Sequence, residues 1–377
     1  MPEQGEVLII GAGPVGLFLG LALGRKGIHC TVIDRRLDWA EETRAIGIHP
    51  PSMALFDRLG IGNAIRTHGR SITKGVALVG KRELGVMRFN ADSGSGIVTL
   101  PQYKTEALLR EAMKDTSTRI ISGMTPSHME ERDGAVHVQC RGHDGAERRW
   151  FVNYAVGCDG HDSWVRERMG VAFQGSDYPD RYIMGDFPDH LQAAETAYIY
   201  LSSDGLVEAI PLPEGRRRWV LRLESDIDSS NHHTFRALIH ERTGEDPIAA
   251  NGTPRLSAFG IQRYVAERVV SGRVILAGDA AHVMSPIGGQ GMNAGWLDAW
   301  DLLHVLSGHA AWTDYDRVVR RRAAMAIRRA PHNTLLGRPF VFPGLKSGFV
   351  GMMLNTPLRS IWQRRFTMQG LPRLAAA

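Results

Sequence analysis

A glycine-rich turn near the start of the 377-residue chain constrains its fold more than any other feature. An apolar stretch, 6–10, runs into Gly-Ala-Gly-Pro-Val-Gly at 11–16, and a second apolar stretch, 17–23, follows at once. A second predicted strand, 29–33, ends in Asp34. Strand, tight turn, helix and second strand are typical of the βαβ unit that opens an α/β fold with a parallel sheet and binds a dinucleotide.

Each glycine of this turn has a physical role. Gly11 allows the tight turn, Gly13 lets the backbone approach a pyrophosphate, and Gly16 lets the helix pack closely on the strand. The N-terminus of the helix then faces the phosphates, and Asp34 is placed to accept a hydrogen bond from a ribose hydroxyl. The motif leaves NAD, NADP and FAD open. Arg35 and Arg36 would favour a 2′-phosphate, whereas the Asp34 carboxylate would repel one.

Two later motifs also follow apolar strands. One strand leads into Asp-Gly at 159–160, and Ser163, a residue typical of helix N-caps, comes shortly after. The other leads into Gly-Asp at 278–279, and a glycine-rich loop then precedes a predicted helix at 294–306. One extended nucleotide would explain both glycine-rich loops, because the first would hold its pyrophosphate and the second its far end.

Between the motifs the sequence alternates between sheet and short helices. The stretches 71–98 and 185–226 show the β-branched residues and alternation typical of strands. A helix is predicted to begin with Ser52 as its N-cap and to end at Gly60. These stretches predict a second, sheet-rich part of the molecule.

Taken together, the three motifs resemble the single-component (class A) FAD-dependent aromatic hydroxylases, which are similar to p-hydroxybenzoate hydroxylase. The resemblance covers roughly residues 5–310. It implies a Rossmann-like FAD-binding domain, an inserted mixed β-sheet substrate domain and C-terminal helices. We expect the FAD-binding domain at 1–74, 100–179 and 263–330, the substrate-binding domain at 75–99 and 180–262, and a C-terminal helical segment at 331–377.

The resemblance also implies which residues contact the flavin cofactor. The implied FAD-binding residues are Gly11, Gly13, Pro14, Val15, Gly16, Asp34, Arg35, Arg44, Gln102, Asp159, Gly160, Gly278, Asp279, Pro286, Gly289, Gly291, Met292 and Asn293. Two positions depart from the family pattern, since Asp34 stands where Glu is usual and Ser285 where Pro is frequent. His49 and Arg222 are candidates for the substrate side, and the catalytic residues are otherwise unknown. No metal site is expected.

The implied reaction uses NADPH or NADH and O₂ to hydroxylate an aromatic or polycyclic phenolic substrate through a flavin C4a-hydroperoxide. Only one dinucleotide fingerprint occurs, so NAD(P)H is expected to visit transiently. The reactive chemistry belongs to the cofactor, while the protein supplies position, electrostatics and a dry site. The sequence leaves open the substrate and its regiochemistry, NADH against NADPH, hydroxylation against epoxidation or Baeyer-Villiger insertion, and the oligomeric state.

The basic residues of the chain are concentrated near its C-terminus, which raises the question of an anionic binding partner. Residues 317–377 contain eleven Arg, one Lys and no acidic residue. We expect these arginines to pair with acidic residues of the same chain, and no module for binding nucleic acid is recognisable. With no targeting segment at its start and only three cysteines, the chain is expected to be cytoplasmic.

Three other functions are compatible with parts of this pattern. The apolar, basic tail suggests a membrane-associated quinone-precursor hydroxylase, although terminal helices that cover the core explain the tail better. A non-catalytic FAD-binding sensor or partner protein would carry the same fingerprint. A flavin halogenase is disfavoured because its Trp-x-Trp-x-Ile-Pro signature is absent.

Overall fold

The computed structural model describes residues 3–39, 45–89, 96–223, 231–247, 255–285, 288–337 and 343–374. Within these ranges the strands form two large sheets and one small sheet. The first sheet contains β1 (Glu3–Ile10), β2 (Cys30–Asp34), β8 (Arg119–Ser122), β9 (Met124–Arg132), β10 (Ala135–Gly142), β11 (Glu147–Gly157), β17 (Val270–Ser271) and β18 (Val274–Leu276). The second sheet contains β5 (Lys74–Val79), β6 (Arg82–Arg88), β12 (Phe173–Pro188), β13 (Thr196–Ser202), β14 (Gly205–Leu212), β15 (Arg216–Leu223), β16 (Leu256–Ala266) and β19 (His282–Val283). The small sheet contains β3 (Gly47–Ile48), β4 (Arg70–Ile72) and β7 (Ile97–Thr99).

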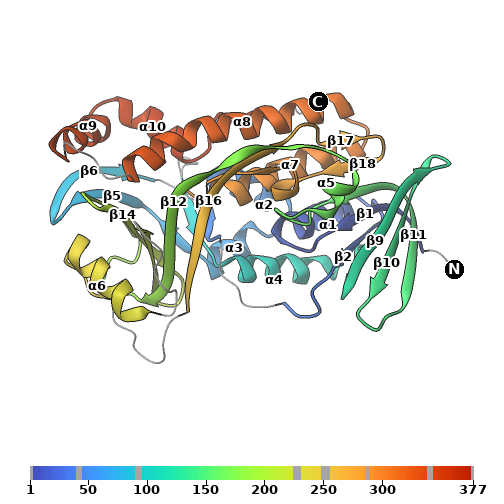
Figure 1. Cartoon of the computed structure of the whole chain (residues 1–377), viewed down its shortest axis with the longest axis horizontal. Coiled ribbons are helices and arrows are strands. Elements are labelled where there is room, and N and C mark those ends of the chain that lie inside the picture. The colour runs from blue at the N-terminus through green and yellow to red at the C-terminus, as the bar shows by residue number, and fades with distance from the viewer. Residues whose placement is uncertain are drawn as a thin grey trace.

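Helices surround these sheets (Figure 1). They are α1 (Pro14–Arg25), α2 (Pro50–Arg58), α3 (Gly62–His68), α4 (Gln102–Met113), α5 (Trp164–Arg168), α6 (His232–Thr243), α7 (Gln290–Leu306), α8 (Trp312–Gly337), α9 (Pro343–Asn355) and α10 (Leu358–Phe366), with the short 3₁₀ helix η1 (Gly278–Ala280). The long helix α8 contacts both α7 and strands of the second sheet. Among the described helices, none is both long enough and apolar enough to pass through a bilayer.

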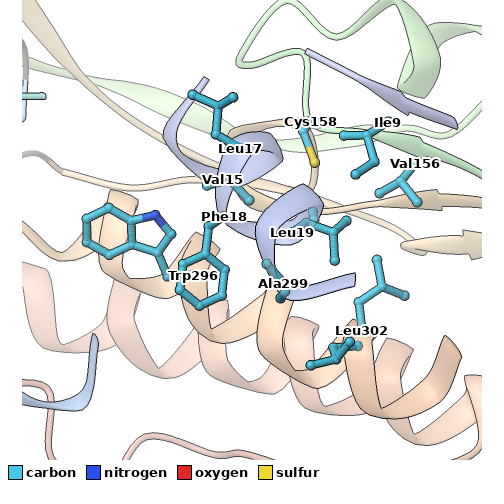
Figure 2. Packing of buried hydrophobic residues seen from close by; sticks show 14 of the residues in the cluster. Ile9, Val15, Leu17, Phe18, Leu19, Val156, Cys158, Trp296, Ala299 and Leu302 are labelled. Atoms are coloured by element: carbon cyan, nitrogen blue, oxygen red, sulfur yellow. The ribbon is translucent and has the colours of Figure 1, made fainter. Parts of the chain in front are cut away.

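The centre of the first sheet is parallel, with the strand order β8-β2-β1-β11-β18. Helix α1 lies between this sheet and α7, and Figure 2 shows its side chains directed at both. Every residue from 15 to 23 in α1 is buried, as expected for a helix covered on all sides. The indole N–H of Trp296 in α7 donates to the Pro14 carbonyl at 3.0 Å and joins the two helices at their N-terminal ends.

The second sheet is covered by different elements on its two faces. One face, here called the α6 face, packs Val207, Trp219 and neighbouring apolar residues against α6. The opposite face, here called the α9 face, packs Val220 and its neighbours against Val350 of α9. Figure 1 shows α6 and α9 on opposite sides of this sheet. Residue alternation along each strand therefore decides which layer a side chain joins.

Two predicted helix starts have different outcomes. Ser163 is the N-cap of α5, because its hydroxyl accepts from the N–H of Arg166 at 3.0 Å, as predicted. The prediction for Ser52 is wrong: α2 begins at Pro50, with His49 as its N-cap residue. Proline is well suited to the first helical position, so the helix starts before Ser52, whose hydroxyl is buried without a partner.

Candidate functional site

The three sequence motifs meet at one edge of the first sheet. Strand register aligns Ile10 with both Ile33 and Gly157, and Gly157 in turn with Leu276. The strands are parallel, so the residues that follow them emerge at their common carboxyl edge, where such sheets bind ligands. Segments 11–16, 34, 159–160 and 278–279 therefore lie side by side although they span most of the chain.

The turn before α1 is shaped to admit a phosphate group. Gly11 has a φ of +108°, and a Cβ there would lie 2.4 Å from the Cys158 carbonyl oxygen, so this position requires glycine. A Cβ added at Gly13 would meet nothing within 4 Å. No side chain caps the first turn of α1, whose N–H groups face this open space. Uncapped N–H groups at a helix N-terminus are a typical anion site.

Asp34 is held by the turn and by a nearby arginine. Its carboxylate accepts from the N–H of Ala12 at 2.7 Å and from Nε of Arg36 at 2.9 Å. Burial alone raises the pKa of Asp34, but these hydrogen bonds and the Arg36 charge lower it overall. Asp34 thus stays ionised beside the phosphate-facing turn, while Arg35 is exposed.

The second motif is tied to its own helix and to the third motif. Asp159 accepts from the Ser163 hydroxyl and from the N–H of Val165, so its carboxylate supports the start of α5. Burial raises the pKa of Asp159. The guanidinium of Arg166 donates to the carbonyls of His161 and Ala280 at 2.8 and 3.1 Å, and so joins the two motifs.

In these two motifs Gly160 is half-buried and Asp279 is exposed. Gly160 has a φ of +86°, and a Cβ there would meet nothing within 4 Å. Asp279 is exposed, although Gly278 and Ala280 beside it are buried. The second and third motifs therefore place a half-buried glycine and an exposed carboxylate at the carboxyl edge.

A network of buried charged residues, contributed mainly by α7 and α8, holds the third motif in place. Asp298 of α7 accepts from the N–H of Gly278 at 3.2 Å and lies 2.6 Å from Nε2 of His282. Arg322 of α8 pairs with both Asp298 and Asp301, and the side chains of these residues are almost completely buried. Burial opposes the charge of His282, but Asp298 outweighs this effect and raises its pKa. His282 therefore holds the motif from inside.

The N-terminus of α7 forms the second open helix end. Gly289 precedes it with a φ of +65° and no side chain caps it. Asn293 accepts from the N–H of His49 at 2.8 Å and donates to the Gly47 and Gly289 carbonyls, so it ties the loop after β3 to α7. Nε2 of His49 lies 2.8 Å from the Gly288 carbonyl oxygen, and burial lowers the pKa of His49 to about 4. His49 is thus neutral beside this helix end.

The remaining predicted residues have varied positions. Arg44 and Pro286 lie outside the described residues. Gln102 begins α4 and donates to Glu106 at 2.9 Å. Arg222 pairs with Asp180 at 2.9 Å, and its side chain passes over Gly205 at the far hairpin of the second sheet. The predicted contacts Pro14, Val15, Gly16, Gly291 and Met292 lie in the first turns of α1 and α7.

Two residues of this region have no counterpart among the predicted site residues. The ring of Phe366 in α10 lies 5.9 Å from His49 and 5.9 Å from Phe89, centroid to centroid. Glu208 of β14 lies on the α9 face, opposite Ile199 and Val220 on the neighbouring strands. Apolar periodicity singles out neither residue, because the position of each depends on pairing between distant segments.

These residues fit an extended dinucleotide. Two uncapped helix N-termini, at Pro14 and Gln290, suit anionic or electron-rich groups at two separated points. The open space at Gly13 and Gly160 and the ionised Asp34 lie on the sheet edge that carries the first of them. The fold and the site therefore define a dinucleotide-binding α/β protein with a second sheet beside its site.

Comparison with known proteins identifies the family. Residues 4–330 match the model of the family described as "FAD binding domain", so the chain belongs to this family. This confirms the resemblance drawn from the three motifs, and FAD is the cofactor. The individual FAD contacts stay predictions.

Similar proteins are flavin-dependent monooxygenases by name. The chain is 31% identical over 315 residues to a flavin-dependent monooxygenase of Mycobacteroides abscessus, covering 78% of this chain and 66% of the relative. It is 30% identical over 327 residues to 6-methylpretetramide 4-monooxygenase of Streptomyces rimosus, covering 82% and 58%. The chain thus spans less than two thirds of the length of these curated relatives.

Solved structures share the fold. Anhydrotetracycline hydroxylase from Streptomyces rimosus superposes with a TM-score of 0.79 at 25% identity, covering 99% of this chain and 78% of that one. p-Nitrophenol 4-monooxygenase from Pseudomonas putida superposes with a TM-score of 0.84 at 22% identity, covering 97% of each chain. These likenesses confirm the predicted fold class, a Rossmann-like FAD-binding fold with a mixed second sheet.

Proposed function

We propose that this protein is an FAD-dependent monooxygenase that uses NAD(P)H and O₂ to hydroxylate an aromatic or polycyclic phenolic substrate. The observation that carries the proposal is the position of the α7 N-terminus. It lies beside neutral His49 and Phe366, and Phe366 packs in turn against Phe89 at the edge of the second sheet. A flavin ring at this helix end would face a second layer able to cover an aromatic substrate.

Names of relatives support the substrate class. The relatives from Streptomyces rimosus are named for 6-methylpretetramide and anhydrotetracycline, and other relatives are named for pentachlorophenol and rifampicin. These names favour a ring compound as the substrate.

Different residues of the chain would bind the two ends of the cofactor. When bound, FAD supplies the redox chemistry, by accepting hydride from NAD(P)H and activating O₂. The first turn of α1 binds the pyrophosphate, Asp34 orients the ribose, and exposed Asp279 lies toward the middle of the cofactor. The partial positive charge at the start of α7 stabilises negative charge on the ring system.

The second sheet and the C-terminal helices would complete the site. We assign substrate binding to 75–99 and 180–262, FAD binding to 1–74, 100–179 and 263–330, and a covering role to 331–377. Phe366 and its neighbours would exclude water from the reacting ring. NAD(P)H has no fingerprint of its own in the sequence, which favours a transient visit. Three buried, unpaired cysteines are compatible with a cytoplasmic protein.

Stopped-flow flavin absorbance tests this function. Purified protein loaded with FAD is mixed anaerobically with NADPH or NADH, with and without phenols of increasing ring number, and then with O₂. We expect a substrate phenol to accelerate flavin bleaching by at least an order of magnitude, and ¹⁸O₂ to label the product. Equal bleaching with every phenol and no labelled product would instead identify a non-catalytic flavoprotein.

A further inference from the structure

One carboxyl group on the α9 face has no ionic or hydrogen-bonding partner among the described residues. Glu208 lies in the middle of β14, opposite Ile199 of β13 and Val220 of β15. Its chain neighbours Val207 and Ala209 are fully buried on the α6 face, whereas Glu208 keeps a partly exposed side chain. A carboxyl group among apolar side chains is costly unless it is hydrogen-bonded or paired with a charge.

Two arginines of β15, each two residues from Val220 and so on this face, are already paired. Arg218 forms two hydrogen bonds with Asp186, at 2.6 and 2.9 Å. Arg222 donates to Asp180 at 2.9 Å. Glu208 therefore has no counter-ion on the neighbouring strand, and burial raises its pKa to about 7.

The face that carries Glu208 continues to the α7 N-terminus. Ala197, two residues before Ile199 on β13, is on the same face and packs in one cluster with Phe89 and Phe366. Phe366 contacts His49, which binds the Gly288 carbonyl at the start of α7.

The far end of β14 abuts the flavin side of the molecule. The Thr99 hydroxyl of the small sheet donates to the Pro211 carbonyl at 2.6 Å. Pro211 is three residues beyond Glu208, so Glu208 lies about 10 Å from this junction along the strand. Thr99 pairs with Gly47, whose carbonyl accepts from Asn293 at the start of α7, so β14 is linked through the small sheet to the helix end proposed for the flavin ring.

We propose that Glu208 is a specificity-determining residue that accepts a hydrogen bond from a hydroxyl of the aromatic substrate. This inference rests on the proposed function and narrows its substrate class. A phenol hydroxyl would supply the donor that the described part of the chain does not provide. A substrate carboxylate in the same place would meet a second carboxyl group and be repelled, or would need to share a proton with it. Glu208 therefore selects neutral phenols against aromatic acids.

Equilibrium binding to the FAD-loaded protein tests the inference, with flavin and tryptophan fluorescence as readouts. The probes are 2-naphthol, 2-naphthoate and 2-methoxynaphthalene, which share one ring system. We expect the wild-type protein to prefer 2-naphthol over both others by at least 10-fold, since a hydrogen bond to a charged group contributes roughly this factor or more. The variant Glu208→Gln is expected to reduce the preference over 2-naphthoate by about 10-fold.

Glu83→Gln is the matched control, because Glu83 lies in the same sheet but is exposed, and it should leave the preference unchanged. The methoxy comparison needs no variant, so it tests the inference even if Glu208→Gln does not fold. Equal affinity of the wild-type protein for 2-naphthol and 2-methoxynaphthalene would overturn the role of Glu208. So would a Glu208→Gln variant that keeps the wild-type preference for 2-naphthol over 2-naphthoate. Neither result would affect flavin uptake or NAD(P)H oxidation, on which the proposed function rests. Protein that takes up no FAD would overturn both proposals.

Discussion

At the scale of single residues, Gly11 and Gly13 differ in what surrounds them. Replacement of Gly13 by Ala places a methyl group in open space, so the free energy of unfolding of the cofactor-free protein should change by no more than about 1 kcal/mol. The same methyl group occupies the space of the pyrophosphate, so FAD affinity should fall by at least about 10-fold. Urea denaturation and fluorescence titration with FAD measure the two effects.

Gly11→Ala serves as the contrasting variant. Its Cβ would collide with the backbone of Cys158 at a φ of +108°, so a loss of more than about 2 kcal/mol in unfolding free energy is expected even without cofactor. If Gly13→Ala bound FAD as tightly as the wild type, the pyrophosphate would have to lie elsewhere.

His49 should make the stability of the protein depend on pH. Burial lowers its pKa to about 4 in the folded state, whereas an unfolded histidine has a pKa near 6.5. Between pH ~6.5 and pH ~4 only the unfolded chain binds this proton. The free energy of unfolding therefore decreases as the pH is lowered, and the decrease reaches about 2 kcal/mol at pH ~5. Urea denaturation at several pH values should show that His49→Gln removes this part of the dependence.

The exposed His128 offers a control for this measurement. His128→Gln should leave the pH dependence as it is in the wild type. A His49→Gln curve parallel to the wild-type curve would show that folding does not lower the pKa of His49.

At the scale of secondary structure elements, one arginine joins α7, α8 and the irregular segment 371–374 near the C-terminus. Arg322 pairs with Asp298 and Asp301 and donates to the Pro372 carbonyl at 3.0 Å, while Asp301 also accepts from the N–H of Leu374. Arg322→Met removes the buried guanidinium that pairs with both carboxylates, leaves Asp298 with His282 only, and should cost about 3–5 kcal/mol of unfolding free energy. Denaturation by urea measures the loss.

Arg321 precedes Arg322 on α8 but is exposed, so Arg321→Met should change stability by less than about 0.5 kcal/mol. A similar small effect of Arg322→Met would mean that water or another group replaces the guanidinium between the two carboxylates. Arg317, Arg320 and Arg322 thus pair with acidic residues of the same chain, as expected for the arginines of the C-terminal region; for the others this stays a prediction.

The elements around the three motifs could be predicted because their signals are local. The turn at 11–16 and the N-cap Ser163 depend on residues within one turn of each other. The start of α2 was missed because Pro50 suits the first helical position better than Ser52 suits the cap. Local signals of this kind fix where a strand or helix begins, but not what it faces.

The substrate side of the site could not be predicted in this way. The face on which Glu208 lies depends on its pairing with β13 and β15, and a shift of one residue would place it under α6 instead. Phe366 reaches His49 from more than 300 residues away along the chain. Arg222 is a candidate for contact with the substrate. Its ion pair with Asp180 joins residues 42 positions apart, and so could not be predicted from local sequence signals.

At the scale of the whole molecule, the cofactor site exists only in the folded chain. Segments 11–16, 34, 159–160 and 289–293 come together through strand register and helix packing, so the unfolded chain has no site for FAD. A ligand that binds only the folded state stabilises it by about 2.7 kcal/mol at 100 times its dissociation constant. The melting temperature should therefore rise steadily with the logarithm of the FAD concentration.

Differential scanning calorimetry at several FAD concentrations measures this rise, and Gly13→Glu provides the control. Its carboxylate would fill the open space at the first turn of α1 and repel the pyrophosphate, so its melting temperature should not respond to FAD. AMP and riboflavin, which each carry one end of the cofactor, should raise the melting temperature of the wild type less than FAD does. A rise with riboflavin equal to that with FAD would show that the α7 end binds alone, contrary to a site that needs both helix ends.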